Sequence, residues 1–172
     1  MKRYKIADMH FGHKNIIQYE NRPFENASMM DEALIRLWNG VVEMEGLVYA
    51  LGDFTLSRRK EIIANLANRL SGRKVLIMGN HDTGKPRDYI ECGFEVACRK
   101  PMMAEPGVIL MHEPFDDPAL VASNYLYFFG HVHANRTLMD EYPNCMCVSA
   151  ERIQYTPIDL DGCIERMRGA NP

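Results

Sequence analysis

The feature that most constrains this chain is a series of short apolar runs, each of which ends in histidine, aspartate or asparagine. The six histidines all lie at or just beyond the C-terminal end of such a run: His10, His13, His81, His112, His131 and His133. The same kind of position is occupied by Asp8, Asp53, Asn80 and Asp82. Because open α/β sheets bind ligands outside the carboxyl ends of their strands, we expect these side chains to meet in one crevice.

Helical stretches separate several of the apolar runs. Continuous apolar runs are typical of strands buried on both faces, and we expect strands over residues 2–8, 46–53, 73–82, 107–113, 124–133 and parts of 144–160. Helices are expected over residues 28–43, capped by Ser28, and over 58–70. The first helix carries an apolar stripe that should face the core: Met30, Leu34, Leu37, Trp38 and Val41. This order predicts an α/β or mixed sandwich, with residues 1–172 in a single domain because no repeat, low-complexity tract or linker interrupts it.

Charge and apolar content limit the classes of function. The 172-residue chain has a formal net charge of −3, which argues against extended nucleic-acid binding because that requires a basic stripe. The N-terminal segment turns polar before the apolar region of a signal peptide could form. No apolar run approaches the roughly 20 residues that a membrane helix needs. We therefore expect a cytoplasmic protein with no membrane partner.

The five cysteines do not form the pattern of a disulfide framework, because their number is odd and their spacing is scattered. Cys145 and Cys147 are two residues apart and would share one face of a strand. Such a pair can form a metal or redox site, or it can be two small buried apolar residues. The second interpretation is favoured, because free cysteine is among the most buried residue types.

The spacing of the polar residues suits metal binding. Asp8 and His10 are two residues apart, as are His131 and His133, so an extended backbone presents each pair on one side. Glycines precede the donors at Gly52, Gly79 and Gly130. A mixture of imidazole, carboxylate and amide suits Zn, Mn, Fe or Ni better than Ca or Mg. Seven of the polar residues can supply donors: Asp8, His10, Asp53, Asn80, His112, His131 and His133. Seven donors exceed the needs of one ion and suit two ions about 3.5–4 Å apart that share a carboxylate.

One ordered set of motifs resembles the calcineurin-like metallophosphoesterase superfamily: Asp8-x-His10, Gly52-Asp53, Gly79-Asn80-His81-Asp82, His112 and Gly130-His131-x-His133. The set spans residues 8–133. The segments DMHFGHKNII and NRPF are similar to those of small bacterial or phage-type phosphoesterases. The resemblance implies a four-layer αββα sandwich, in which two mixed β-sheets are flanked by helices.

The resemblance also implies a role for each residue. The first of two divalent metal ions would be held by Asp8, His10, Asp53 and His133. Asp53 would bridge to the second ion, which is completed by Asn80, His112 and His131. His81 would donate a proton to the leaving oxygen, with Asp82 orienting its ring. A hydroxide bridging the two metal ions would attack phosphorus, with Mn as the first choice and Fe, Ni or Zn as alternatives.

Two further residues are candidates for binding substrate. His13 follows His10 closely and could contact a phosphate, or it could be an accessory or surface histidine. Arg22 lies in the polar NRPF segment, where its guanidinium could hold a phosphate with two hydrogen bonds. An ordinary surface arginine is the favoured alternative for Arg22.

Several functions agree with these residues. A phosphodiesterase is favoured, because the alkoxide that leaves a diester benefits from a proton donor such as His81. The alternatives are a phosphomonoesterase acting on a small molecule, a nuclease for short oligonucleotides and a non-catalytic metal-binding scaffold, which an intact His81 argues against. The expected substrate is a small phosphate ester or a nucleotide-like molecule. A homodimer is plausible, since twofold symmetry is the commonest form of assembly.

Overall fold

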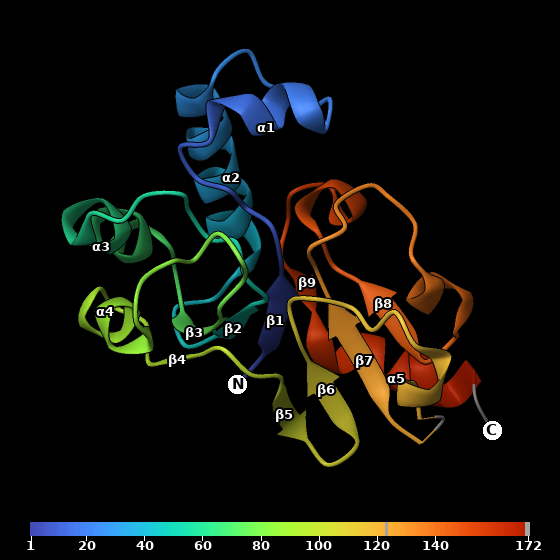
Figure 1. Ribbon diagram of the computed structural model, residues 1–172. Helices are drawn as coiled ribbons and strands as arrows, with labels where there is room; N and C mark the ends of the chain where they lie inside the picture. The colour runs from blue at the N-terminus through green and yellow to red at the C-terminus, as the bar shows by residue number, and fades with distance from the viewer. Residues whose placement is uncertain (123, 171–172) are drawn as a thin grey trace.

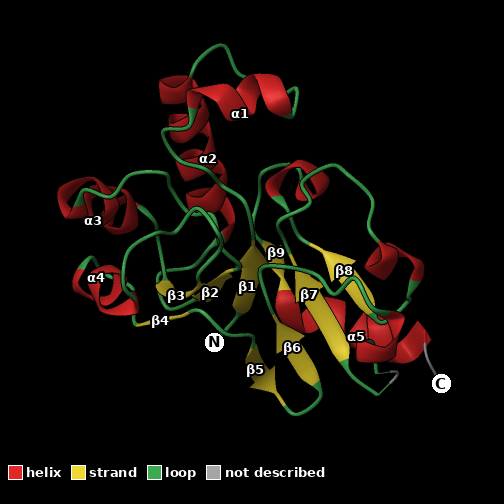
Figure 2. Cartoon of the chain, in the orientation of Figure 1, coloured by secondary structure: helices red, strands yellow, loops and turns green. Residues whose placement is uncertain are grey.

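The computed structural model describes residues 1–122 and 124–170 and contains two mixed β-sheets with helices packed around them (Figure 1, Figure 2). This confirms the α/β class and the two flanked sheets that the sequence predicts. The helices are α1 (Lys14–Tyr19), α2 (Ala27–Val41), α3 (Lys60–Arg69), α4 (Pro86–Glu91) and α5 (Leu160–Ala170). The short 3-10 helices are η1 (Pro118–Leu120), η2 (Leu138–Glu141) and η3 (Ala150–Ile153).

The first sheet has five strands in the order β4-β3-β2-β1-β9. They are β1 (Arg3–Ile6), β2 (Leu47–Ala50), β3 (Arg73–Ile77), β4 (Val96–Cys98) and β9 (Ile158–Asp159). Strands β1 to β4 run parallel, and β9 joins β1 in the antiparallel direction. Ile6 pairs with Ala50, and Ala50 pairs with Leu76. The carboxyl ends of β1, β2 and β3 therefore lie level with one another along the same edge.

The second sheet has four strands in the order β5-β6-β7-β8. They are β5 (Met102–Glu105), β6 (Val108–Leu110), β7 (Leu126–Phe129) and β8 (Cys145–Cys147). Strands β6, β7 and β8 are parallel. In β7, Leu126 and Phe128 belong to the main core, which also contains residues of the first sheet, whereas Tyr127 and Phe129 belong to a smaller cluster. This alternation places the main core between the two sheets.

The cysteine pair lies on β8. Cys147 is buried in the smaller cluster, and Cys145 packs against the same cluster, so the two side chains share one face as expected. All five cysteines are free thiols. The packing agrees with the interpretation of the pair as small buried residues rather than as a redox site.

Helix α2 forms close to the expected range, but its N-cap and its buried face differ from the prediction. The cap is Asn26, whose side chain accepts a hydrogen bond from the backbone N–H of Met29, and not Ser28. Trp38 is buried as expected and donates its indole N–H to the carbonyl of Ser71 at 2.9 Å. Val41 is exposed, because the buried face of α2 contains Ala33 and Ile35 and does not include Val41.

Several elements differ from the sequence prediction. Helix α3 begins at Lys60 rather than at residue 58. The predicted strands over 46–53 and 73–82 are shorter in the structure, because each segment leaves the sheet before its polar end. The sequence analysis did not predict α1, α4 and α5 or the strands β4 and β5. Most of these are short or half-exposed, so their apolar pattern is weak. Within residues 1–122 and 124–170, no helix is long and apolar enough to cross a bilayer.

Candidate metal centre

The predicted ligands follow the carboxyl ends of five parallel strands. Asp8 follows β1, Asp53 follows β2 and Asn80 follows β3, while His112 and His131 follow β6 and β7 of the second sheet. Hydrogen bonds join these loops, both within the first sheet and between the two sheets. The N–H of Asp8 donates to the carbonyl of Gly52 at 3.0 Å, and the N–H of His131 donates to Oδ2 of Asp8 at 2.8 Å. The expected crevice is therefore formed where the two sheets meet.

The backbone of the ligand residues is strained. A left-handed conformation is uncommon outside glycine, yet it is adopted by Asp8 (φ 58°), His10 (φ 53°), Asp53 (φ 53°), His131 (φ 72°) and His133 (φ 52°). Each such residue costs about 1–3 kcal/mol, and residues of this kind cluster at functional sites, where the surrounding structure fixes them. The concentration of strain at these five positions indicates that the loops are shaped for their side chains rather than for stability.

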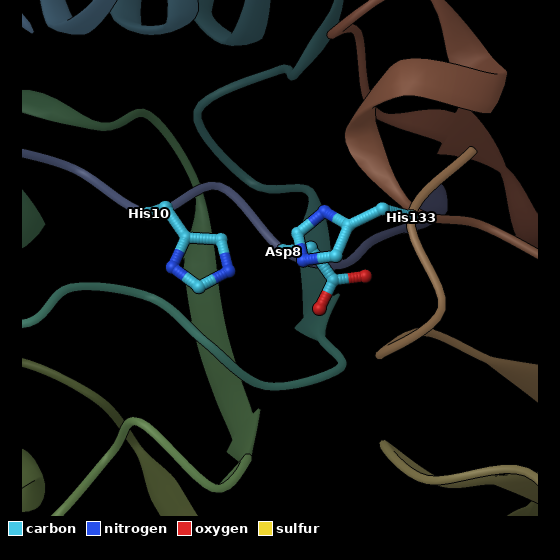
Figure 3. Close-up of side chains that lie close together, drawn as sticks. All are labelled: Asp8, His10 and His133. Carbon is cyan, nitrogen blue, oxygen red and sulfur yellow. The ribbon is translucent and has the colours of Figure 1, made fainter. Parts of the chain in front are cut away.

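Three of the side chains form one set, which we call the inner group: Asp8, His10 and His133. One ligand atom of each lies within 4.8 Å of the others, and Figure 3 shows the ring of His133 over the carboxylate of Asp8 with His10 beside them. Burial lowers the pKa of His10 to about 2, so its ring is neutral. Both ring nitrogens of His10 are buried and lack a hydrogen-bond partner in the described part of the chain. A bound cation would satisfy the unprotonated nitrogen.

A second set, which we call the outer group, consists of Asn80, His112 and His131. Nδ1 of His112 donates to the carbonyl of Leu51 at 2.9 Å, so Nε2 carries the lone pair of the neutral ring. Burial lowers the pKa of His112, which keeps the ring neutral. Its Nε2 lies 2.9 Å from Oδ1 of Asn80 and 3.2 Å from Nδ1 of His131. Two acceptors at 2.9 Å repel one another, and a cation between them would remove that repulsion.

Asp53 lies between the two groups. Its Oδ2 is 3.5 Å from Nε2 of His10 and 3.6 Å from Nε2 of His112. Ligand atoms of Asp8, Asp53 and His112 also lie within 4.8 Å of one another. Burial raises the pKa of Asp8 to about 7, because an ionised carboxylate is poorly solvated there. These buried carboxylates and imidazoles could hold metal ions, and Asp53 is placed to contact both groups.

Two glycines let the loops approach this closely. A Cβ on Gly79 would lie 2.2 Å from Oδ1 of Asp53, and a Cβ on Gly52 would lie 2.3 Å from Nδ1 of His112. Gly52 also has a φ of 89°, which side chains other than glycine rarely adopt. Any larger residue at either position would push a predicted ligand out of place.

His81 and His13 lie at the mouth of the centre. The side chain of His81 is 42% exposed, and its Nε2 is 4.0 Å from Oδ2 of Asp53. The ring of His13 lies 5.4 Å from that of His10 and 6.4 Å from that of His81. Both imidazoles are therefore near the predicted ligands and within reach of a molecule that enters from solvent.

Asp82 is placed differently from the expectation that it orients His81. Its buried carboxylate accepts backbone N–H groups from Asp53 at 2.8 Å, Phe54 at 3.1 Å and Gly79 at 2.9 Å. No contact with the ring of His81 is found among the described residues. Asp82 therefore connects the loops that follow β2 and β3, which carry Asp53 and Asn80.

Arg22 is neither on the surface nor free to contact a substrate. It is buried, and its guanidinium donates to the backbone carbonyls of Asp8 and Met9 and to Glu151. The placement favours a supporting role behind the centre over both the candidate contact with phosphate and the favoured surface position. Glu151 also contacts Nδ1 of His133 at 3.2 Å, a role that the sequence analysis did not assign. The sequence contains a signal that could have identified Glu151: it follows the apolar run of β8, just as the other site residues follow the apolar runs of their strands.

A cleft of about 650 Å³ opens beside the outer group. Asn80, His112 and His131 line it together with Lys100 and Phe115. The cleft therefore exposes predicted metal ligands, a basic side chain and an aromatic ring to the same entering molecule.

Comparison with known proteins places the chain in a family. It is 39% identical over 169 residues to the uncharacterized protein MJ1445 of Methanocaldococcus jannaschii. The alignment covers 93% of this chain and 88% of the relative. The chain belongs to the MJ1445 family. Gene 66 protein of Mycobacterium phage L5 is 34% identical over 82 residues, covering 46% of this chain and 39% of that protein. No family model matches.

The fold of this MJ1445-family protein is also found in a solved structure. The crystal structure of AQ665, a protein of unknown function from Aquifex aeolicus, matches it with a TM-score of 0.75 and 26% sequence identity. The match covers 96% of this chain and 98% of the other. The shared fold supports the arrangement of the two sheets, and the function has to be inferred from the site itself.

Proposed function

We propose that the protein is a metal-dependent phosphoesterase that binds two divalent metal ions and hydrolyses phosphodiesters. The observation that carries this proposal is the position of Asp53 between the inner and outer groups, with Oδ2 3.5 Å from His10 and 3.6 Å from His112. Two neighbouring donor sets that share a carboxylate suit a pair of ions, which is the usual arrangement for displacement at phosphorus.

The residues of the two groups fit such ions. Asp8, His10, Asp53 and His133 would hold one ion, and Asp53, Asn80, His112 and His131 would hold the other. The mixed nitrogen and oxygen donors favour Mn, with Fe, Ni or Zn as alternatives. When bound, the ions would supply an activated water and neutralise negative charge on phosphate.

His81 is the proposed proton donor. Its backbone N–H donates to Oδ1 of Asp53 at 2.9 Å, so the loop holds the residue beside the shared carboxylate while the ring remains partly exposed. From this position the imidazole can give a proton to the oxygen that leaves phosphorus, which a diester needs more than an activated monoester does. His13, whose ring lies 6.4 Å from that of His81, would contact a non-bridging oxygen of the same phosphate.

The test uses metal-stripped protein with Mn, Ni, Zn or Mg added in turn, assayed on bis-p-nitrophenyl phosphate and on p-nitrophenyl phosphate. We expect metal-dependent turnover of the diester and its loss in Asp53→Ala. His81→Ala should lower kcat by about 10²- to 10⁴-fold for a diester with an alkoxide leaving group, and by less for p-nitrophenyl esters, whose leaving group needs little protonation. Lys2→Ala is the matched control, because Lys2 is exposed and pairs with Glu43 near the opposite end of β1.

Two outcomes would contradict the proposal. Turnover of the monoester alone would agree with the proposed metal ions but would make the protein a phosphomonoesterase. No turnover with any metal, while elemental analysis finds two bound ions, would favour a non-catalytic scaffold.

A further inference from the structure

A buried ion pair lies directly behind the inner group. The side chain of Arg22 is 0% exposed and that of Glu151 is 6% exposed, and their Nη2 and Oε1 atoms are 2.6 Å apart. Arg22 comes from the loop between α1 and α2, whereas Glu151 lies in η3, after the second sheet. Burying two charges is expensive, and replacing such a pair by apolar residues is often neutral or stabilising. Stability is therefore a weak explanation for this pair.

The guanidinium of Arg22 also holds the strained backbone of the inner group. Its Nη2 donates to the carbonyl of Asp8 at 2.7 Å, and its Nη1 donates to the carbonyl of Met9 at 2.9 Å. Asp8 has a φ of 58°, so these two bonds fasten the turn that carries a predicted metal ligand in an unfavourable conformation. A lysine could not make the same contacts, because its ammonium lacks the planar fork of donors.

Glu151 fixes the other side of the inner group. Its Oε1 lies 3.2 Å from Nδ1 of His133, and a carboxylate can only accept, so Nδ1 carries the proton. The lone pair of the neutral ring is then on Nε2, the nitrogen that Glu151 does not occupy. In metal sites, a carboxylate in this position fixes the tautomer and the orientation of a ligating histidine.

We propose that Arg22 and Glu151 act as positioning residues for the inner metal site, Glu151 by setting the tautomer of His133 and Arg22 by holding Glu151 and the Asp8 turn. This inference rests on the proposed function, since it concerns the same site. It assigns the two side chains to one unit that connects the α1–α2 loop, the end of β1 and η3.

Glu151 could instead be a metal ligand, because Glu20, His133 and Glu151 also have ligand atoms within 4.8 Å of one another. The structure argues against this. Oε1 of Glu151 already accepts from Arg22 and His133, and a cation on that oxygen would lie beside a guanidinium. The remaining oxygen, Oε2, is buried and has no partner in the described part of the chain, so it is the one atom of Glu151 that a cation could occupy. The two roles differ in what Glu151→Gln should do.

The first experiment measures Mn affinity and stoichiometry by calorimetry and elemental analysis. Glu151→Ala and Arg22→Lys should weaken the tighter site by about 10- to 100-fold. Glu151→Gln should weaken the site less than Glu151→Ala does, because its amide oxygen still accepts from Nδ1 of His133, although the charge that balances Arg22 is lost. Glu20→Ala is the control and should bind as wild type does. Equal losses in Glu151→Gln, Glu151→Ala and Glu20→Ala would make Glu151 a ligand and overturn the positioning role.

The second experiment does not depend on metal. Nitrogen NMR of the histidine rings in metal-free protein, at mildly alkaline pH, reports which ring nitrogen of His133 carries the proton. We expect Nδ1–H in the wild type and in Glu151→Gln, and a mixture with Nε2–H in Glu151→Ala. An unchanged tautomer in Glu151→Ala would overturn the inference even if metals bind. If the wild type binds no metal but shows the expected tautomers, the proposed function fails and the positioning of His133 stands.

Discussion

The inner and outer groups contain the same kinds of donor but differ in their surroundings. Asp8 and His10 are 0% and 1% exposed, and Arg22 and Glu151 support them from behind. In the outer group the side chain of His131 is 35% exposed, and its members line a cleft of about 650 Å³. A buried site fixed by other side chains loses little freedom on binding a cation, whereas an open site competes with water. We therefore expect a tight inner ion and a weaker outer ion that faces the substrate.

The largest expected effect comes from removing a donor in the inner group. In His10→Ala, we expect the affinity of the tighter Mn site to fall by more than about 100-fold, beyond the range seen for residues that only support ligands. Asn80→Ala should weaken only the second ion, because Asn80 lies at the exposed edge of the outer group. Calorimetric titration of both variants measures the two sites. Equal losses at both sites in both variants would show that the groups do not differ as proposed.

A smaller effect is expected for the residue that links the two loops. Asp82→Asn should lower the free energy of unfolding by about 2 kcal/mol, because one carboxylate oxygen that accepts N–H groups becomes an NH₂ that cannot accept. Urea denaturation of the metal-free protein measures this change. Asp88→Asn is the matched control, since Asp88 is half-exposed and pairs with Lys60 at the surface. A loss of unfolding free energy no larger than in the control would contradict the structural role of Asp82.

The sequence predicted the candidate ligands of both groups better than it predicted the residues that support them. All seven predicted ligands lie where the strands end, because residue order alone places polar side chains beyond an apolar run. The supporting pair was not predictable in the same way. Arg22 lies in a polar segment that reads as surface, and its burial depends on the position of Glu151, which is far away in the sequence. Contacts of this range depend on how the two sheets pack, which no local pattern encodes.

The same reason explains the helices that the sequence missed. Helix α1 has one buried residue, Ile16, and α4 has one, Tyr89, so neither has an apolar stripe that a periodicity can detect. The role of Asp82 differed from expectation because its neighbour in sequence, His81, was assumed to be its partner. In the fold, the backbone amides of Asp53 and Gly79 lie closer to its carboxylate.

The stabilisation by metal should depend on pH at the inner group. Burial raises the pKa of Asp8 to about 7 in the metal-free fold. Between its unfolded and folded pKa values the folded state holds a proton that the unfolded state has lost, so this group's contribution to stability falls as pH rises. A bound cation stabilises the ionised carboxylate of Asp8 and so offsets this loss of stability at higher pH. Mn should therefore stabilise the fold more at about pH 8 than at about pH 6, by about 1 kcal/mol in the free energy of unfolding, and the increase in Tm on adding Mn should be correspondingly larger.

Asp8→Asn provides the control for this pH dependence. It removes the carboxyl that titrates, so the difference in metal-induced Tm shift between the two pH values should shrink. Some pH dependence should remain, because His133 also titrates. Burial lowers the pKa of His133, but the hydrogen bond to Glu151 and nearby carboxylates raise it overall. An unchanged pH dependence in Asp8→Asn would exclude Asp8 as its source.

The smallest expected effect concerns the cleft beside the outer group. Lys100 lines the cleft with Asn80 and His112 and can attract an anionic substrate from solvent. Because exposed charges contribute about 0.2–1 kcal/mol, Lys100→Ala should raise KM by about two- to fivefold, leave kcat nearly unchanged and leave Mn affinity at both sites unaltered. Steady-state kinetics at two salt concentrations measure this, and the effect should weaken as salt rises. If Lys100→Ala lowered the Mn affinity of the inner group, the two groups would not be electrostatically separate, and the contrast between a supported inner site and an open outer site would fail.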